Sequence, residues 1–235
     1  MSYDYRAWRK RKIDRGEWLS KEEYLKKKRV KIDSYKDHSI YLEGVEKNLE
    51  RLVILDTETT GLSNRDKIIE LSIIEVIKGE MTDNIYHSYY KPNVKINEGA
   101  TKVHGIKDSD LEDKPLFKDE VEKIIKFIGH SKIVAHNSRF DMRMLNNELN
   151  DCSIKSYPEE NFIDTLKIAK YLFPEGKCNL DSLCERFKVE SDRLEGGKHS
   201  AVEDTKILCK VYQNLNKLLE DKDLTPYDFC QKKVV

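Results

Sequence analysis

Three features are missing from this sequence of 235 residues, and each absence argues against one kind of protein: membrane-spanning, secreted, or built around zinc or disulfides. No apolar run approaches the roughly 18 to 20 residues that a membrane-spanning helix requires. The basic N-terminus is not followed by an apolar segment, so we expect no secretory signal. The five cysteines contain no Cys-x-x-Cys pair, which argues against a zinc knuckle and a disulfide framework. We therefore expect a soluble cytoplasmic protein with reduced thiols and no membrane partner.

The chain also lacks a net charge, because 43 lysines and arginines balance 43 aspartates and glutamates. The charge is nevertheless uneven. Residues 1–36 contain 13 basic against 6 acidic side chains, which leaves the remainder of the chain acidic. An acidic domain that acts on an anionic polymer needs metal ions, and the basic segment would add electrostatic attraction.

Aromatic and basic side chains alternate at the start of the chain. They are Tyr3, Tyr5, Arg6, Trp8, Arg9, Lys10, Arg11, Lys12, Arg15 and Trp18. This pattern fits three roles equally: stacking on single-stranded nucleic acid, anchoring a protein interface, or docking on the chain's own main domain.

The chain is long enough for one main domain with an appendage. We predict a basic aromatic extension over residues 1–48, a main domain over 49–220 and a short tail over 221–235. Ser20–Glu23 has the spacing of a capping box and predicts a short helix within the extension. Residues 32–47 are interpreted as a polar linker or a loosely held segment.

An acidic pair follows the first strongly apolar segment. Leu52–Leu55 predicts a buried strand, and Asp56 and Glu58, two residues apart, then point to the same face. Two carboxylates on one face repel each other unless a cation lies between them, and Mg²⁺ and Mn²⁺ prefer such oxygen ligands. Gly61 would allow a sharp turn that leaves the pair open. The alternative is a strand end followed by a polar turn.

Two further strands are predicted over residues 68–90, joined near Gly79, and they complete a three-stranded antiparallel meander with the first strand. Glu70 is interpreted as a strand-end or surface charge. Residues 91–115, which include His104, predict loops.

Helices then alternate with short apolar segments, which indicates an α/β fold around a mixed sheet. A strand is predicted at 133–135, and helices at 117–128, 138–149, 162–172, 179–187 and 200–219. Asp141 lies in the first turn of one helix, where its charge also complements the helix dipole. His199 and Asp204 would lie about 140° apart on a continuous helix. If both serve one site, His199 must precede the helix, next to Gly196 and Gly197.

Five motifs carry a resemblance to a known family. In chain order they are L-D-T-E-T-T-G, V-H-G-I, A-H-N-S-R-F-D, N-L-D-S-L-C-E-R-F and H-S-A-V-E-D. Together they resemble the DEDDh 3′–5′ exonucleases of the ribonuclease H-like superfamily, and most of all the proofreading epsilon-type branch of bacterial DNA polymerase III. The resemblance covers about residues 50–218. It implies a ribonuclease H-like mixed sheet, a meander plus parallel strands, flanked by helices.

The same resemblance implies roles for five residues. Asp56, Glu58 and Asp204 would bind one Mg²⁺ or Mn²⁺ ion, while Asp56 and Asp141 would bind a second. His199 would be the general base. Two ions are suited to phosphodiester hydrolysis because they activate water, neutralise charge and stabilise the leaving oxygen. A histidine accepts a proton near neutral pH.

Contacts to the substrate are also implied by the resemblance. Thr59 would contact the 3′ end and Leu62 would be an apolar wedge against the last base, while His104, Asn137 and Phe140 would line the groove. For each, ordinary packing or turn formation is the alternative. His136, Asp164 and Asp181 are read as structural.

The sequence thus predicts a divalent-metal-dependent exonuclease that acts on single-stranded or frayed DNA 3′ ends, in proofreading, repair or end trimming. One alternative is trimming of RNA 3′ ends, because no motif reports a contact to the 2′-hydroxyl. Another is a nuclease-fold subunit that docks on a polymerase or a CRISPR adaptation complex through residues 1–36.

Overall fold

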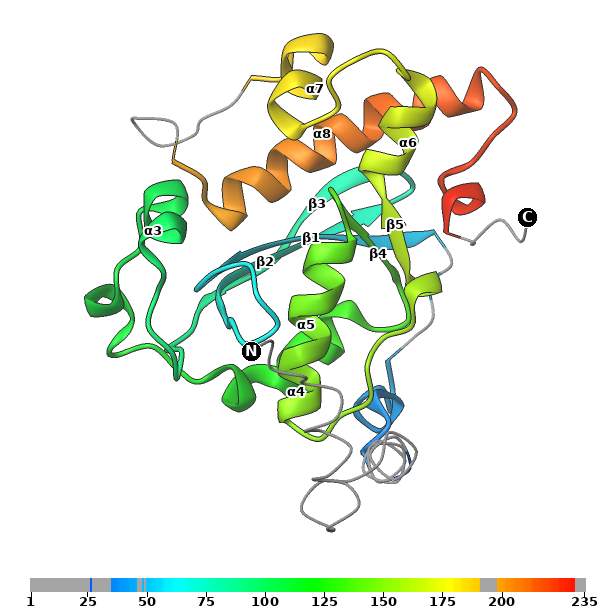
Figure 1. The fold of residues 1–235 in the computed structure, drawn as a ribbon. Coiled ribbons are helices and arrows are strands. Elements are labelled where there is room, and N and C mark those ends of the chain that lie inside the picture. Colours follow the sequence, from blue (N-terminus) through cyan, green and yellow to red (C-terminus); the bar gives the residue numbers. More distant parts are fainter. Residues whose placement is uncertain (1–25, 27–34, 46–47, 49, 191–197, 231–235) are drawn as a thin grey trace, which may run out of the picture.

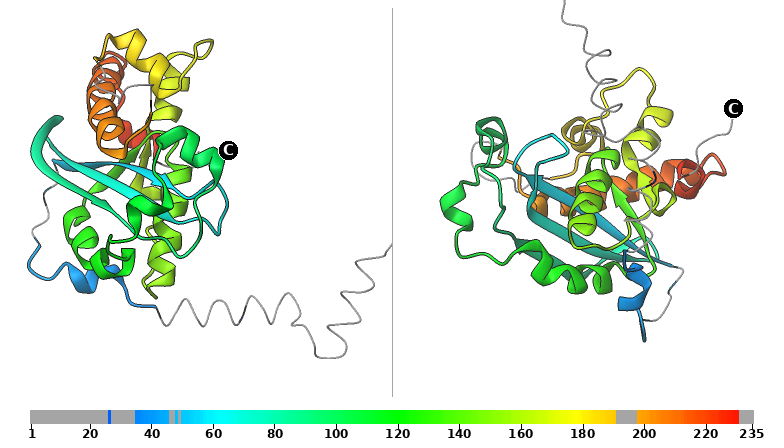
Figure 2. Two further views of the ribbon diagram at one scale, coloured as in Figure 1. Left: turned by 90° about the vertical axis from the view of Figure 1, so that its left-hand side faces the viewer. Right: turned by 60° about the horizontal axis from the view of Figure 1, so that its bottom comes forward.

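The computed structural model describes residues 26, 35–45, 48, 50–190 and 198–230. Figures 1 and 2 show one twisted sheet held between two layers of helices. Most of the aromatic extension, including nearly all of its predicted short helix, and the Gly196-Gly197 pair lie outside the described residues.

Five strands form the sheet, in the order β3-β2-β1-β4-β5. They are β1 (Arg51–Thr59), β2 (Ile68–Ile77), β3 (Glu80–Tyr89), β4 (Lys132–Ala135) and β5 (Phe162–Asp164). The first three are antiparallel, whereas β4 pairs in parallel with β1 and β5. This confirms the predicted mixed sheet of a meander plus parallel strands. The predicted helix over 162–172 begins only at Thr165, because Phe162–Asp164 form β5, and three residues are too few to display the alternating pattern of a strand.

Helices cover both faces of the sheet (Figure 1). They are α3 (Glu98–His104), α4 (Phe117–Ile128), α5 (Arg139–Asp151), α6 (Thr165–Leu172), α7 (Leu180–Phe187) and α8 (Ala201–Glu220), with short 3-10 helices at His38–Tyr41, Asp108–Leu111, Glu159–Asn161 and Pro226–Phe229. Among the described residues, no helix is both long enough and apolar enough to span a bilayer.

Helix α3 corrects the expectation that residues 91–115 are only loops. The side chain of Asn97 accepts a hydrogen bond from the N–H of Gly99 and caps its start. Gly105, with φ near 80°, ends it in the left-handed conformation that glycine adopts at low cost. His104 is therefore the last residue of a helix, and its side chain is buried.

The alternation of β1 assigns its side chains to two apolar cores. Val53 and Leu55 pack with the layer of α4 and α5, whereas Leu52 and Ile54 pack with the layer of α6, α7 and α8. Each such fully buried aliphatic side chain contributes about 1.5 to 3 kcal/mol. The cores fix the register of β1, so the acids that follow Ile54 at even positions face α8.

Residues 35–45 pack against the main domain, so the predicted polar linker is wrong for this described part. The N–H of Lys36 donates to the carbonyl of Ser153 at 2.8 Å, and Lys36 accepts from the N–H of Lys155 at 2.9 Å. Leu42 is buried in the core with α4 and α5. The domain boundaries at 48 and 220 stay a prediction.

Candidate active site

The strand half of the site lies at the end of β1. Asp56 and Glu58 share the face of β1 that α8 covers, and Glu58 is buried while Asp56 is partly exposed. Thr57 between them points to the opposite layer, where its Oγ1 donates to Oδ1 of Asp141 at 2.8 Å. Asp141 is buried in the first turn of α5. One strand therefore presents two acids directly and holds a third through the intervening threonine.

The helix half lies at the start of α8. Asp204 is buried in the first turn of α8, and its Oδ2 is 2.7 Å from Nδ1 of His199. His199 precedes the helix, as its spacing from Asp204 predicts. Its N–H donates to the carbonyl of Val103 at the end of α3, at 3.1 Å. The two halves meet where β1 passes under the start of α8.

The two halves converge at the level of individual atoms. One ligand atom each from Glu58, His199 and Asp204 lies within 4.8 Å of the other two. Loss of hydration, together with repulsion by the carboxylates of Asp141, Glu58 and Asp204, raises the pKa of Asp56 well above its usual range. Burial raises the pKa of Asp141 to about 7, although the hydroxyl of Thr57 opposes this shift.

This donor set fits hard divalent cations. Carboxylate oxygens are the ligands that Mg²⁺ and Mn²⁺ prefer, and a cation would relieve the repulsion that raises these pKa values. In this structure the imidazole of His199 is hydrogen-bonded to Asp204, and ligand atoms of both side chains lie close to Glu58. The expected division of labour, in which the acids bind metal and His199 is a base, stays a prediction.

A cavity of about 360 Å³ adjoins Glu58. Four of the five residues expected to contact substrate line it: Thr59, Leu62, His104 and Phe140. Asn137 does not. It lines a neighbouring cavity of about 570 Å³ together with Asp56, His199 and Asp204, on the other side of the acids.

Leu62 lines the first cavity with a side chain that is 78% exposed, and its backbone is held by α5. Arg143 of α5 donates to the carbonyl of Leu62 at 2.9 Å, and its guanidinium lies over the ring of Phe140. The lack of a side chain on Gly61 also leaves room for Asp66, whose carboxylate accepts from the hydroxyl of Thr60 and from the N–H of Ser63. A Cβ on Gly61 would lie 2.9 Å from the carboxylate of Asp66.

Two further residues have the structural roles that the sequence predicts. Nδ1 of His136 lies 2.9 Å from the hydroxyl of Thr165. Asp164 accepts from the N–H of Leu166, which caps α6, and from the N–H of Asn137. His136 and Asp164 thus position the segment that carries Asn137.

The interpretation of Glu70 as a strand-end or surface charge is wrong. Glu70 lies inside β2 directly opposite Glu58, with its side chain fully buried. Its position in a run of buried apolar residues was the available signal, because an acidic residue inside a buried strand cannot reach water. Thr57 was also missed. Its position between two acids places it on the opposite face, but no local pattern names Asp141 as its partner.

Comparisons with known proteins agree with this geometry. A family model described as exonuclease (RNase_T) matches residues 53–212. The DNA polymerase III subunit epsilon of Buchnera aphidicola is 40% identical over 174 residues, which covers 70% of this chain and 74% of that protein.

Solved structures show the same fold. Exonuclease X, in complex with 5′ overhanging duplex DNA, is 27% identical with a TM-score of 0.61, covering 76% of this chain and 97% of that chain. The nuclease domain of 3′hExo, a DEDDh family member bound to rAMP, has a TM-score of 0.61 over 75% of this chain and 95% of its own. At 16% identity the second match concerns the fold alone.

Proposed function

The chain belongs to the exonuclease family whose model covers residues 53–212, and from this premise we propose that it removes nucleotides from DNA 3′ ends with the aid of two divalent ions. One observation carries the proposal: Glu58, Asp204 and His199 converge, and Glu58 also lines a cavity. Similarity to a polymerase subunit named epsilon supports DNA as the substrate and replication as the setting.

The acids would hold the metal ions. Asp56, Glu58 and Asp204 would bind one ion, and Asp56 and Asp141 the other, directly or through water. When bound, the ions would activate the attacking water and stabilise the charge that develops on the phosphate and on the leaving 3′-oxygen. Mg²⁺ and Mn²⁺ both suit these ligands.

His199 would take the proton of the attacking water. Its Nδ1 lies 2.7 Å from Oδ2 of Asp204, so this nitrogen would carry the proton that is donated to the carboxylate. The other ring nitrogen, Nε2, would then be the acceptor, on a side chain that is 36% exposed.

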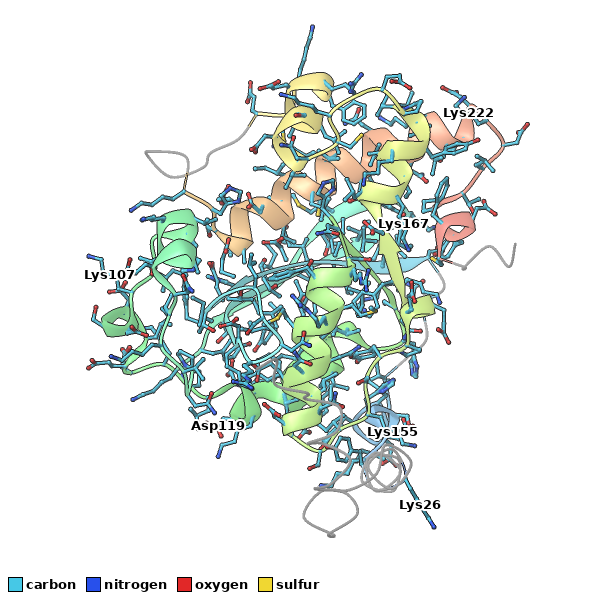
Figure 3. All side chains as sticks on the ribbon, viewed as in Figure 1. Lys26, Lys107, Asp119, Lys155, Lys167 and Lys222 are labelled. Carbon is cyan, nitrogen blue, oxygen red and sulfur yellow. The ribbon has the colours of Figure 1, made fainter. Side chains whose placement is uncertain are left out.

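The terminal nucleoside would occupy the cavity of about 360 Å³, with Leu62 and Phe140 against the base and Thr59 near the sugar. The strand upstream of the cleaved bond would pass Asn137, which is shared by the cavity of about 570 Å³ and another of about 490 Å³. Lys170 lines both of these cavities, and Lys167, labelled on α6 in Figure 3, lines the second. Their charges suit backbone phosphates.

A labelled oligonucleotide tests the proposal. A 5′-labelled single strand incubated with Mg²⁺ should shorten progressively, and a 3′-labelled strand should release labelled mononucleotide at once. Chelation of the metal and the Asp56→Asn substitution should both abolish these products. Cleavage that persists in chelator, or a 3′ label that persists while the 5′ end is removed, would contradict the proposal.

RNA is the competing substrate. Parallel digestion of DNA and RNA of one sequence separates the two, because discrimination depends on contacts at the 2′ position. A higher kcat/KM on DNA is expected. A higher value on RNA would assign the enzyme to RNA 3′-end trimming.

A protein partner, a polymerase or another DNA-processing complex, would bind through residues 1–36. The support is the excess of basic residues and the interleaved tryptophans in this segment, which lies mostly outside the described residues. Deletion of residues 1–36 should leave cleavage of short oligonucleotides intact while weakening binding to long DNA or to the partner. Loss of activity on dinucleotides would place the segment in the active domain instead.

A further inference from the structure

Glu70 is a fully buried carboxylate for which the catalytic scheme has no role. It lies on β2, and its Cα pairs across the ladder with that of Glu58. Residues directly opposite each other on antiparallel strands project to the same face. Glu70 therefore points to the layer of α8, next to a proposed metal ligand.

Donors from the start of α8 and from β3 surround this carboxylate. The N–H of Ala201 donates to Oε2 at 3.2 Å, and the hydroxyl of Ser200 donates to Oε1 at 3.2 Å. Nε2 of His87, on β3, lies 2.9 Å from Oε1, and the hydroxyl of Tyr89 on the same strand also interacts with Glu70. Ala201 and Ser200 are the residues that directly follow His199 in the chain.

These contacts replace the usual cap of α8. The first N–H groups of a helix lack partners within the helix, and the side chain of the N-cap residue ordinarily accepts from one of them. Here the N-cap residue, Ser200, makes no such bond. Instead its hydroxyl and the N–H of Ala201 both donate to Glu70, so the helix is capped from the neighbouring sheet. A negative charge at this end also favours the helix dipole.

We propose that Glu70 is a positioning residue that fixes His199 and Asp204 relative to Glu58. It joins the start of α8 to the strand that pairs with β1, so the distance between the two halves of the site depends on it. In the scheme proposed above it touches neither substrate nor metal. This inference rests on the proposed function for its effect on catalysis, but not for its effect on the start of α8.

Graded substitutions test this role. Glu70→Gln keeps one oxygen for Ala201 or Ser200, whereas Glu70→Ala removes all acceptors. Supporting residues of a metal site typically change affinity or activity about 10- to 100-fold. We therefore expect kcat to fall about tenfold in Glu70→Gln and about a hundredfold in Glu70→Ala, with KM changed less than about twofold because the nucleoside cavity is intact. Ser200→Ala, which removes one bond, should have the smallest effect.

Two readouts do not depend on activity. The affinity for Mn²⁺, measured by electron paramagnetic resonance, should fall in the same order as kcat. The amide of Ala201 should exchange with solvent faster in Glu70→Ala, as measured by hydrogen exchange. If the wild-type chain degrades no nucleic acid, the proposed function fails, while these two measurements still decide the role of Glu70.

Glu148→Gln is the matched control. Glu148 is also buried and accepts a backbone N–H, that of Ile68, but it lies on α5 away from α8. Its variant should lose thermal stability without losing Mn²⁺ affinity or kcat. Equal losses in the Glu148 and Glu70 variants, or wild-type kcat and Mn²⁺ affinity in Glu70→Ala, would overturn the proposal.

Discussion

The two halves of the site are held in very different ways. Asp56 and Glu58 lie on β1, which is hydrogen-bonded to β2 on one side and to β4 on the other and is buried between two apolar cores. His199 precedes α8 and is connected to the rest of the domain by a backbone bond to Val103, by its side-chain hydrogen bond to Asp204 and by the neighbouring contacts to Glu70. The difference matches the tasks proposed for Asp56 and Glu58 on one side and for His199 on the other, because metal ligands require fixed spacing whereas a proton acceptor must adjust to its water.

Removal of one acid from each half is expected to have the largest effect. Asp56→Asn and Asp204→Asn each remove a proposed metal ligand, and metal ions contribute several kcal/mol to stabilising transition-state charge. A loss of about 4 kcal/mol lowers kcat roughly a thousandfold. Single-turnover digestion of a labelled strand measures this. If kcat falls strongly in Asp56→Asn but not in Asp204→Asn, Asp204 lies outside the metal site.

His199→Gln is expected to have the next largest effect. General bases contribute on the order of a hundredfold or more, so kcat should fall about a hundredfold while Mn²⁺ affinity changes little. His136→Gln is the control, since His136 contacts Thr165 rather than the acids. An equal loss of kcat in both variants would argue for a structural role of His199.

The contrast between the halves also explains what the sequence could predict. Asp56, Glu58 and the placement of His199 before its helix follow from strand and helix periodicity, which are local properties. The bond between Thr57 and Asp141 and the contacts of Glu70 join residues that are far apart in the chain, and no local pattern specifies them. β1, β2 and β4 were predictable because they are apolar runs, and β3 because aromatic and polar residues alternate in it, whereas β5 is too short to be recognised.

Neither helix α3 nor the packing of residues 35–45 was predicted, and the reason is related. Both are short and polar, and they are stabilised mainly by partners outside themselves, such as Ser153 for the second. Asn137 was expected in the same groove as Phe140 because of the family resemblance. The left-handed backbone of Asn137, with φ of 62°, directs the chain differently and places it in the adjoining cavity.

Thr57→Val is expected to weaken the strand half more mildly. The substitution keeps the shape of the side chain but removes the hydroxyl that donates to Asp141. A hydrogen bond to a charged group contributes about 1.5 to 3 kcal/mol, so kcat should fall about tenfold or somewhat more. Thr57→Ser retains the hydroxyl and should stay within about threefold of wild type. If Ser and Val variants are equally impaired, the methyl group rather than the hydrogen bond is what Asp141 requires.

Asp141→Asn is expected to change the thermal stability of the metal-free chain by about 5 to 10 °C. Burial raises the pKa of Asp141 from 3.8 to about 7, so between about pH 4 and 7 the folded chain retains a proton that the unfolded chain releases. The free energy of unfolding therefore falls as the pH rises through this window, by on the order of a few kcal/mol.

Asparagine carries no ionisable proton, so in chelator Asp141→Asn should melt at a higher temperature than wild type at pH 7.5, by about 5 to 10 °C. The difference should shrink toward pH 5, where Asp141 of the wild-type chain is protonated. Addition of Mg²⁺ at pH 7.5 should raise the melting temperature of wild type more than that of the variant, because the ionised carboxylate of Asp141 is the preferred ligand. If the difference in melting temperature between wild type and variant is the same across this pH range, with and without Mg²⁺, Asp141 neither retains a proton in the folded chain nor binds the metal.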